Sequence, residues 1–347
     1  GEYRGFFWFY FINEHLLRFL NLRYPRDYNT VPRLWFWLLN LVWIFPWTAF
    51  LIGVPRLSFN PGSRAERTRL MAVCWVGVVL LFFTFSTTQE YYSVPVYPAL
   101  AILVGSAISA GGRRIRTATS VLFTISSTVC AVLTVLLVLA WRLPAPGNIS
   151  RALSQHPELY TPSMGHIRDL TVNAFAYLKL PLFLAALAFG GVALGTAKWR
   201  SQSRRVVFIV AVGMIIFFQA ARIALVRFDT YLGSYPLAQS LEQSPPGQLI
   251  ESNSYYAFSS VFCYTNRTAL LLNGRNNNLE YGPYAPGAPR RFIDDREFAS
   301  LWTGPSRCYL LAYGTEMPHL AQLVGESNLR IVTENSGNYL LTNYALP

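Results

Sequence analysis

The chain has 347 residues, of which 52% are apolar and only 13% are charged. This composition is too apolar for an ordinary soluble domain and predicts a membrane protein. The net charge of +12 does not indicate a nucleic-acid partner, because residues 1–227 hold 22 of the 29 Lys and Arg residues and only 7 of the 17 acids. Basic residues between apolar segments orient membrane spans, and residues 228–347 are mildly acidic.

The first predicted element is a helix over residues 6–21, with the sequence FFWFYFINEHLLRFLN. It is too short and too polar to cross a membrane. At 100° per residue, Glu14, His15, Arg18 and Asn21 share one side of this helix. The pattern predicts an interfacial helix with its aromatic side chains toward lipid and a polar stripe toward water or protein.

Six apolar stretches follow, each long enough to cross a bilayer, which takes roughly 20 residues. They are residues 34–54, 70–86, 91–110, 117–141, 174–197 and 206–226. The loops at 55–69, 111–116 and 198–205 are rich in Arg and Lys, whereas the short loop STTQE at 86–90 has no base. Lys and Arg accumulate on the cytoplasmic side, so we expect the first helix and the C-terminal tail on the outer side.

The tail shows short strand and helix patterns in alternation. Strands are predicted at 247–253, 268–274 and 307–313 and as two runs within 329–342, and helices at 254–265, 294–302 and 316–324. This alternation predicts a small α/β layer domain. Asp294 and Glu297 have the spacing of a capping box, and Cys263 and Cys308 would be able to pair in an oxidising compartment.

The predicted fold class is therefore an α-helical membrane protein, with about six transmembrane helices, an interfacial helix and a C-terminal small α/β soluble domain. The predicted boundaries are 1–33 for the interfacial segment, 34–227 for the transmembrane domain and 228–347 for the extracytoplasmic α/β domain.

Two groups of residues have side chains suited to chemistry. Glu14, His15 and Arg18 suit a divalent metal site or an anion clamp, although Glu14 and Arg18 also have the spacing of a simple helical ion pair. The segment Gln89 to Tyr92 lies where the third span begins, on the outer side. Its acid and phenols could contact a substrate headgroup, or they could form an aromatic interfacial belt.

The predicted spans carry almost no ionisable residues near their centres. An ion-coupled transporter normally needs such groups, so this class is disfavoured. Polar groups concentrated on the outer surface favour an enzyme that works on a lipid-linked substrate at the interface.

Several motifs together resemble a known family. In chain order they are NEHLLRFL, PWTAFL, YYSVPVYPALAILVG, FCYTNRTALLLNG and DDREFASLW. Their sequence and order are similar to the C-terminal half of bacterial polyprenyl-phosphate-dependent glycosyltransferases. These are the aminoarabinose-transferase-like relatives of protein O-mannosyltransferases, in the C-type glycosyltransferase superfamily.

The resemblance implies transfer of a sugar from a polyprenyl-phosphate carrier to a lipid or protein hydroxyl on the outer face of the inner (plasma) membrane. It implies that Arg18 and Tyr92 contact the donor phosphate, that Gln89, Glu90 and Tyr91 belong to a substrate loop, and that His15, with Glu14 beside it, binds a divalent metal ion. The family's catalytic carboxylate lies in an early external loop that this chain does not contain, so we expect the chain alone to be inactive. The alternative is a non-catalytic membrane scaffold whose α/β domain binds a partner.

Overall fold

The computed structural model forms two compact units. We call residues 5–137 and 181–220 the helical unit, and residues 1–4, 138–180 and 221–347 the C-terminal unit. The residues that the structure describes are 5–24, 30–86, 88–143, 172–252, 255–256, 258–275, 279, 283, 287–335 and 337–346. Most of the segment 142–173, between the predicted spans 117–141 and 174–197, and most of residues 276–289 therefore lie outside the described residues.

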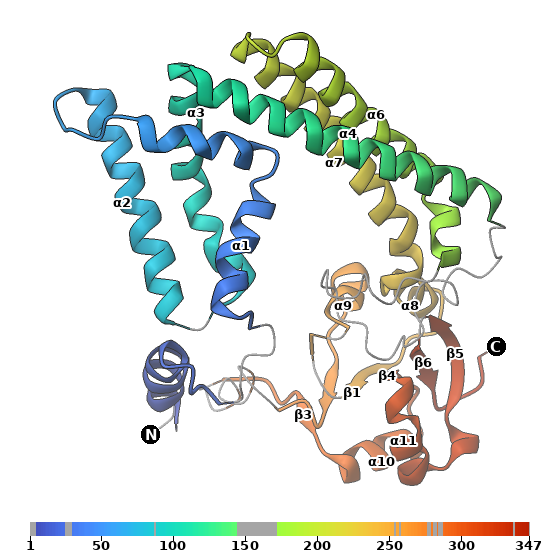
Figure 1. Ribbon diagram of the computed structural model, residues 1–347. Helices are drawn as coiled ribbons and strands as arrows, with labels where there is room; N and C mark the ends of the chain where they lie inside the picture. Colours follow the sequence, from blue (N-terminus) through green and yellow to red (C-terminus); the bar gives the residue numbers. More distant parts are fainter. Residues whose placement is uncertain are drawn as a thin grey trace. The chain divides into compact units, whose positions relative to one another are not determined.

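Helices make up the first part of the chain (Figure 1). They are the π-helix η1 (Trp8–Leu17), α1 (Arg33–Trp43), the 3-10 helix η2 (Trp47–Arg56), α2 (Arg64–Phe85), the 3-10 helix η3 (Glu90–Val96), α3 (Tyr97–Ala110), α4 (Arg113–Arg142), α6 (Lys179–Lys198) and α7 (Ser203–Leu232). Among the described residues, five helical segments are long and apolar enough to cross a membrane. They are α2, the segment Tyr91–Ala110, α4, α6 and the part of α7 up to residue 228.

The first predicted span, 34–54, is not one straight helix. It consists of α1 and η2, which meet at a bend of 103°. Among the described residues, the number of candidate spans rises from five to six if this bent pair is counted as one span. Pro46 follows the end of α1 and has no amide hydrogen to continue the helical pattern. The sequence showed the right apolar length but not the change of direction.

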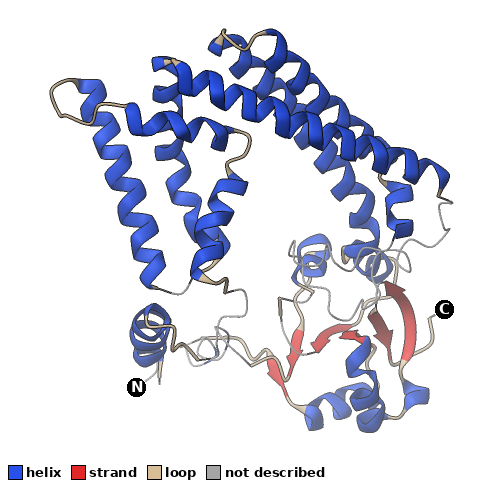
Figure 2. Cartoon of the chain, in the orientation of Figure 1, coloured by secondary structure: helices blue, strands red, loops and turns tan. Residues whose placement is uncertain are grey.

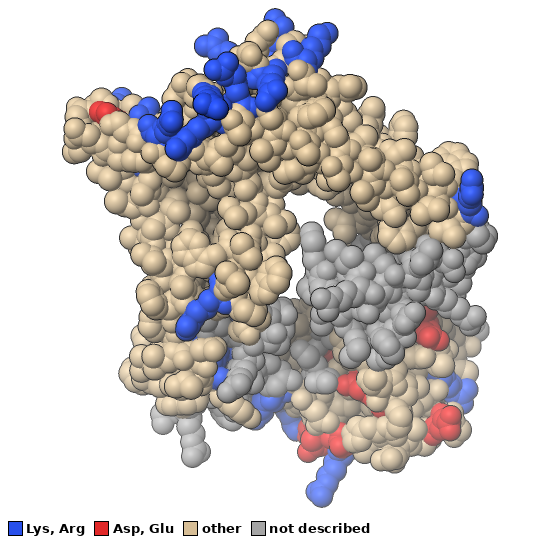
Figure 3. Space-filling model, viewed as in Figure 1, with Lys and Arg blue, Asp and Glu red and all other residues tan. Residues whose placement is uncertain are grey.

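The ends of the helices carry the basic loops that the sequence indicated. Lys and Arg gather at one end of the helices of the helical unit (Figure 3). Arg114 at the start of α4 donates from Nη1 to the carbonyl oxygen of Ile52 on η2 at 3.2 Å, which joins one of these loops to η2. Nearby, Ser63 and Glu66 form a capping box that begins α2.

Small residues allow α6 and α7 to pack closely. A Cβ atom added to Gly195 on α6 would lie 2.6 Å from Cγ2 of Ile209 on α7. A Cβ atom added to Gly213 on α7 would lie 2.5 Å from Cγ2 of Val192 on α6. Close helix contacts at glycine are typical of membrane proteins, where packing rather than water exclusion holds helices together.

The C-terminal unit contains a six-stranded mixed sheet with helices on both faces (Figure 2). The strands are β1 (Gln248–Ser252), β2 (Leu270–Leu272), β3 (Phe292–Ile293), β4 (Cys308–Tyr313), β5 (Arg330–Asn335) and β6 (Asn338–Thr342). The helices are α8 (Tyr235–Glu242), α9 (Ser259–Thr265), α10 (Asp295–Thr303) and α11 (Met317–Val324). The strand order is β3-β2-β1-β4-β6-β5, in which the first four strands are parallel and β6 is antiparallel to both of its neighbours.

Both faces of the sheet are buried, as alternate residues of β4 illustrate. Cys308 and Leu310 pack with α10 and α11, whereas Tyr309 and Leu311 pack with α8 and α9. Cys263 lies on α9 and is exposed, and both it and Cys308 are free thiols. They do not pair, because α9 and the Cys308 side chain belong to opposite faces of the sheet.

The predicted fold class is confirmed. All the strands and helices predicted in the tail are present, and the Asp294–Glu297 capping box begins α10, with the Glu297 N–H donating to Asp294 Oδ1 at 2.9 Å. Among the described residues of the tail, the short elements α8 and β3 and the 3-10 helices η9 (Gly314–Glu316) and η10 (Glu326–Asn328) were not predicted. Strand β3 has only two residues, which is too short to produce a recognisable pattern.

We expect Gly213→Ala to destabilise the packing of α6 against α7. The new methyl group would collide with the stiff, β-branched side chain of Val192, and overpacking of this kind costs about 1–3 kcal/mol. Thermal unfolding in detergent measures the effect. Gly191→Ala on α6 is the matched control, because nothing lies within 4 Å of its added Cβ atom. Equal stability of the two variants would contradict the close contact.

Candidate functional site

The first helix is held in shape by a buried asparagine. Asn13 is only 1% exposed, donates from Nδ2 to the carbonyl oxygen of Tyr24 at 2.7 Å, and accepts from the Tyr24 N–H at 2.9 Å. The helix is wound more widely than an α-helix, since the Arg18 N–H reaches the carbonyl oxygen of Asn13, five residues earlier. The two hydrogen bonds between Asn13 and Tyr24 fold the chain after the helix back onto it. Residues that follow the helix therefore become neighbours of residues within it.

Glu14 lies between two arginines as a result. Its carboxylate accepts from Arg18 Nη1 at 3.3 Å and from Arg23 Nε at 2.7 Å. The Glu14 and Arg23 side chains are 13% and 12% exposed, whereas that of Arg18 is 31% exposed. The helical ion pair considered from the sequence is therefore present, and the Glu14 carboxylate is shared between two guanidinium groups.

Arg23 is a member of this cluster that the sequence did not indicate. It lies nine residues after Glu14 and beyond the helix, so no helical spacing could connect the two residues. Only the fold-back fixed by Asn13 brings its guanidinium group to the carboxylate.

His15 lies beside the cluster against aromatic rings. Its Nδ1–H donates to the carbonyl oxygen of Tyr10, and its ring centroid lies 4.7 Å from that of Tyr10. This bond leaves Nε2 as the acceptor nitrogen, the state in which histidine binds metals. Glu14, however, is engaged by two guanidinium groups, and the described residues contain no group of three His, Cys, Asp or Glu side chains able to hold a metal ion. A metal ion at His15 would need ligands other than Glu14 and stays a prediction.

The second predicted group begins at a buried junction. The Val31 N–H donates to the carbonyl oxygen of Thr88, and the Thr88 hydroxyl donates back to the carbonyl oxygen of Val31. Gln89 is 5% exposed, and its Oε1 has no hydrogen-bond partner within the part of the chain that the structure describes. Tyr91 is exposed, and the side chain of Glu90 lies outside the described part of the chain. The segment is therefore not a uniformly exposed belt, because it turns Gln89 inward.

Aromatic rings connect the two predicted groups. The ring of Phe19, next to Arg18, lies 5.4 Å from that of Phe82, and Phe82 lies 5.1 Å from Phe83. Phe83 in turn lies 4.7 Å from Tyr92, which is half-buried. The end of the first helix therefore reaches the end of α2 and the start of η3. The structure places Phe19, the residue after Arg18, and Tyr92 at the two ends of one continuous set of ring contacts within the helical unit.

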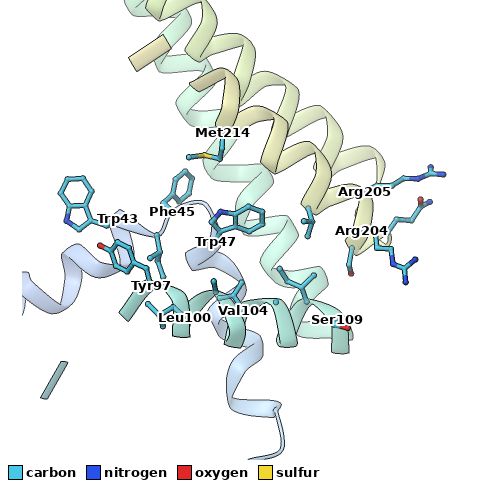
Figure 4. A pocket seen from close by; sticks show the side chains of 18 of the residues that line it. Trp43, Phe45, Trp47, Tyr97, Leu100, Val104, Ser109, Arg204, Arg205 and Met214 are labelled. Atoms are coloured by element: carbon cyan, nitrogen blue, oxygen red, sulfur yellow. The ribbon is translucent and has the colours of Figure 1, made fainter. Parts of the chain in front are cut away.

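A large apolar cavity lies elsewhere in the helical unit, between the α1–η2 bend, α3 and α7 (Figure 4). Its volume is about 1110 Å³. The aromatic side chains of Trp43 and Tyr97 lie toward one end, and Arg204 and Arg205 lie at the other (Figure 4). Apolar walls with a few polar groups at one end are typical of sites for lipid-like molecules.

The C-terminal unit contains a buried acid that the sequence did not single out. Glu251 lies near the carboxyl end of β1 and is fully buried, and one of its carboxyl oxygens, Oε2, has no hydrogen-bond partner among the described residues. Burial raises its pKa to about 8, although the Phe258 N–H donates to Oε1 at 3.1 Å and partly opposes this shift. Glu316 adds a further upward contribution. The available sequence signal was an acid at an inward position of a buried strand.

Comparison with known proteins gives one curated relative and two solved structures. The chain is 27% identical over 310 residues to the undecaprenyl phosphate-alpha-4-amino-4-deoxy-L-arabinose arabinosyl transferase of Erwinia tasmaniensis. The alignment covers 87% of this chain and 50% of the relative. The predicted resemblance is confirmed. No family model matches the chain.

The fold is that of ArnT from Cupriavidus metallidurans. The structure of that protein bound to undecaprenyl phosphate matches 97% of this chain and 56% of its own length, with a TM-score of 0.69 and 19% identity. Its apo structure matches 98% of this chain and 56% of its own length, with a TM-score of 0.66 and 17% identity. The chain therefore spans about half the length of the proteins that it matches, and its helices are those of a multi-pass membrane protein.

We expect Glu251 to make the stability of the protein depend on pH. Its pKa is raised from 4.5 to about 8 in the folded state, so it favours folding below about pH 4.5 and loses this contribution as pH rises through about 8. Unfolding midpoints measured from pH 5 to 9 should therefore fall more steeply for the wild type than for Glu251→Gln. Glu326→Gln, at an exposed position, should keep the wild-type slope. Parallel curves for the wild type and Glu251→Gln would contradict the raised pKa.

Proposed function

We propose that the chain is part of an integral membrane glycosyltransferase that takes a sugar from a polyprenyl-phosphate carrier and transfers it to a hydroxyl group of a lipid or protein acceptor. The similarity to an arabinosyl transferase and the fold shared with a protein crystallised with undecaprenyl phosphate support this proposal. The observation that carries it is the cluster of Arg18, Arg23 and Glu14, together with the ring contacts that run from Phe19, the residue after Arg18, to Tyr92.

The distribution of charge supports an orientation for the proposed enzyme. The protein would lie in the inner (plasma) membrane, and the basic loops at one end of its helices would face the cytoplasm. Helix η1, the segment from Thr88 to Tyr92 and the C-terminal domain would then lie on the outer side. The donor phosphate would be bound at the outer surface of the membrane, where a water-soluble group of the acceptor can approach.

The chemistry requires stabilisation of a leaving phosphate. As the bond from the sugar's anomeric carbon to the phosphate oxygen breaks, negative charge develops on that oxygen, and a guanidinium group can bind it with paired hydrogen bonds. In this proposal Arg18 provides that group, Glu14 holds Arg18 in position, and the Tyr92 phenol donates a further hydrogen bond. Both oxygens of the Glu14 carboxylate contact arginines, so we assign activation of the acceptor hydroxyl to the family's carboxylate in the half that the chain does not span.

The large apolar cavity of the helical unit suits the isoprenoid chain of such a carrier. Its volume of about 1110 Å³ is large enough for a long hydrocarbon segment, and most of its lining is apolar. We propose that membrane lipids fill it when the carrier is absent.

We expect Arg18→Ala to weaken the binding of undecaprenyl phosphate at least tenfold, because a charge-assisted hydrogen bond contributes about 1.5–3 kcal/mol. Native mass spectrometry of the detergent-solubilised chain measures this binding without requiring turnover. Where the catalytic half is present, sugar transfer should fall in parallel. Arg64→Ala, on an exposed arginine at the start of α2, is the control and should bind as the wild type does. Unchanged binding by Arg18→Ala would remove Arg18 from the donor site.

We expect Gly105→Phe to weaken the same binding about tenfold, because its ring would displace at least two methylene groups of the lipid at about 0.8 kcal/mol each. Gly105 lines the cavity, and nothing lies within 4 Å of an added Cβ atom. Gly77→Phe on α2 is the matched control, since its Cβ atom also meets nothing within 4 Å and Gly77 does not line the cavity. Equal binding by the two variants would show that the isoprenoid chain lies elsewhere.

A further inference from the structure

The C-terminal unit has a cavity of its own, which plays no part in the donor site proposed above. Its volume is about 370 Å³, and it lies beside α9, β2 and β3. The lining residues that matter for its chemistry are Tyr255, Phe262, Arg267, Thr268, Arg291 and Phe292. Arg267 and Thr268 belong to the motif FCYTNRTALLLNG, which contributed to the family resemblance and has no role in the proposed donor site.

The sheet brings the two arginines of this cavity together. Helix α9 ends at Asn266, whose left-handed backbone (φ of 49°) turns the chain so that Arg267 comes shortly before β2. Arg291 directly precedes β3, and its carbonyl oxygen accepts from the Leu271 N–H at 2.7 Å. Because β2 and β3 are adjacent and parallel, both arginines lie at the amino ends of neighbouring strands.

Among the residues that the structure describes, no acid balances the charge of this cavity. Arg267 is half-buried, and its Nη1 is buried without a hydrogen-bond acceptor in the described part of the chain. Arg291 is also half-buried, and the described residues that line the cavity include no Asp or Glu. A buried donor on a charged group is costly to leave unpaired, so this wall favours an anion.

The rest of the cavity wall is aromatic rather than charged, and this restricts the class of ligand further. The rings of Tyr255 and Phe262 are stacked with centroids 5.4 Å apart, and Phe292 adds a third aromatic ring. A volume of about 370 Å³ is near the lower limit for small-molecule pockets, so it suits a ligand of about one sugar ring rather than a peptide or a lipid chain.

We infer that this cavity binds a phosphorylated sugar, with the phosphate at Arg267 and Arg291 and the apolar face of the sugar ring against the aromatic side chains. Such a group occurs both in free sugar phosphates and in the headgroups of phosphorylated glycolipids. The inference goes beyond the proposed transferase function and does not depend on it, because the site and its ligand belong to the C-terminal unit alone.

The test uses the full chain in detergent micelles and isothermal titration calorimetry with glucose 1-phosphate, inorganic phosphate and glucose as probes. Glucose 1-phosphate should bind saturably and at least tenfold more tightly than either of the other two. Arg267→Gln and Arg291→Gln should each weaken its binding at least tenfold, since each removes a charge-assisted hydrogen bond. Arg296→Gln, an exposed arginine on α10 outside the cavity, is the control and should bind as the wild type does.

A second pair of probes separates the two sources of the ligand. Tighter binding of the dodecyl phosphodiester of glucose 1-phosphate than of glucose 1-phosphate itself would assign a glycolipid headgroup, and the reverse order would assign a free sugar phosphate. Arg267→Lys keeps the positive charge but lacks the planar guanidinium group, so it should bind with intermediate affinity. Such partial binding would show that the weaker binding of Arg267→Gln does not result from misfolding. Absence of saturable binding by the wild type, equal binding of phosphate and glucose 1-phosphate, or wild-type affinity in both Gln variants would overturn the inference.

Discussion

The hydrocarbon of the membrane is the constraint on which the rest of the helical unit depends. A backbone amide within the bilayer must find its hydrogen-bond partner inside the protein, so the apolar segments become helices and the polar residues move to their ends. The basic loops then gather at one end of the helices (Figure 3). Within this arrangement, glycines such as Gly195 and Gly213 allow α6 and α7 to approach closely.

At the less basic end, a few specific interactions convert an interfacial helix into a candidate donor site. Asn13 folds the following segment back, and this places Arg23 beside Glu14, which also contacts Arg18. Ring contacts run from Phe19, the residue after Arg18, to Tyr92. The same arrangement makes Glu14 less suitable as a metal ligand, because electrostatic attraction to two guanidinium groups already engages its carboxylate.

The C-terminal unit follows a different physical rule, since it is a sheet buried on both faces by helices. Strand β1 lies between β2 and β4 at the point where the strand order reverses, a position at which α/β sheets often bind ligands at the carboxyl ends of strands. Glu251 occupies this position but is fully buried. The cavity that contains Arg267 and Arg291 lies at the amino ends of β2 and β3 instead, so the polar features of this domain are distributed over both ends of the sheet.

The sequence by itself determined the class of the protein, the apolar lengths of its spans, the alternation of strands and helices in the tail and the Asp294–Glu297 cap, because these follow from local composition and periodicity. It also indicated the Glu14–Arg18 pair, whose spacing is helical. Only the tertiary structure decided the bend between α1 and η2 and the inward turn of Gln89. It also decided the ion pair of Arg23 with Glu14 and the separation of Cys263 from Cys308. Each of these depends on where the chain folds back or on which face of a sheet a side chain occupies, and such contacts between distant residues leave no periodic signal in a single sequence.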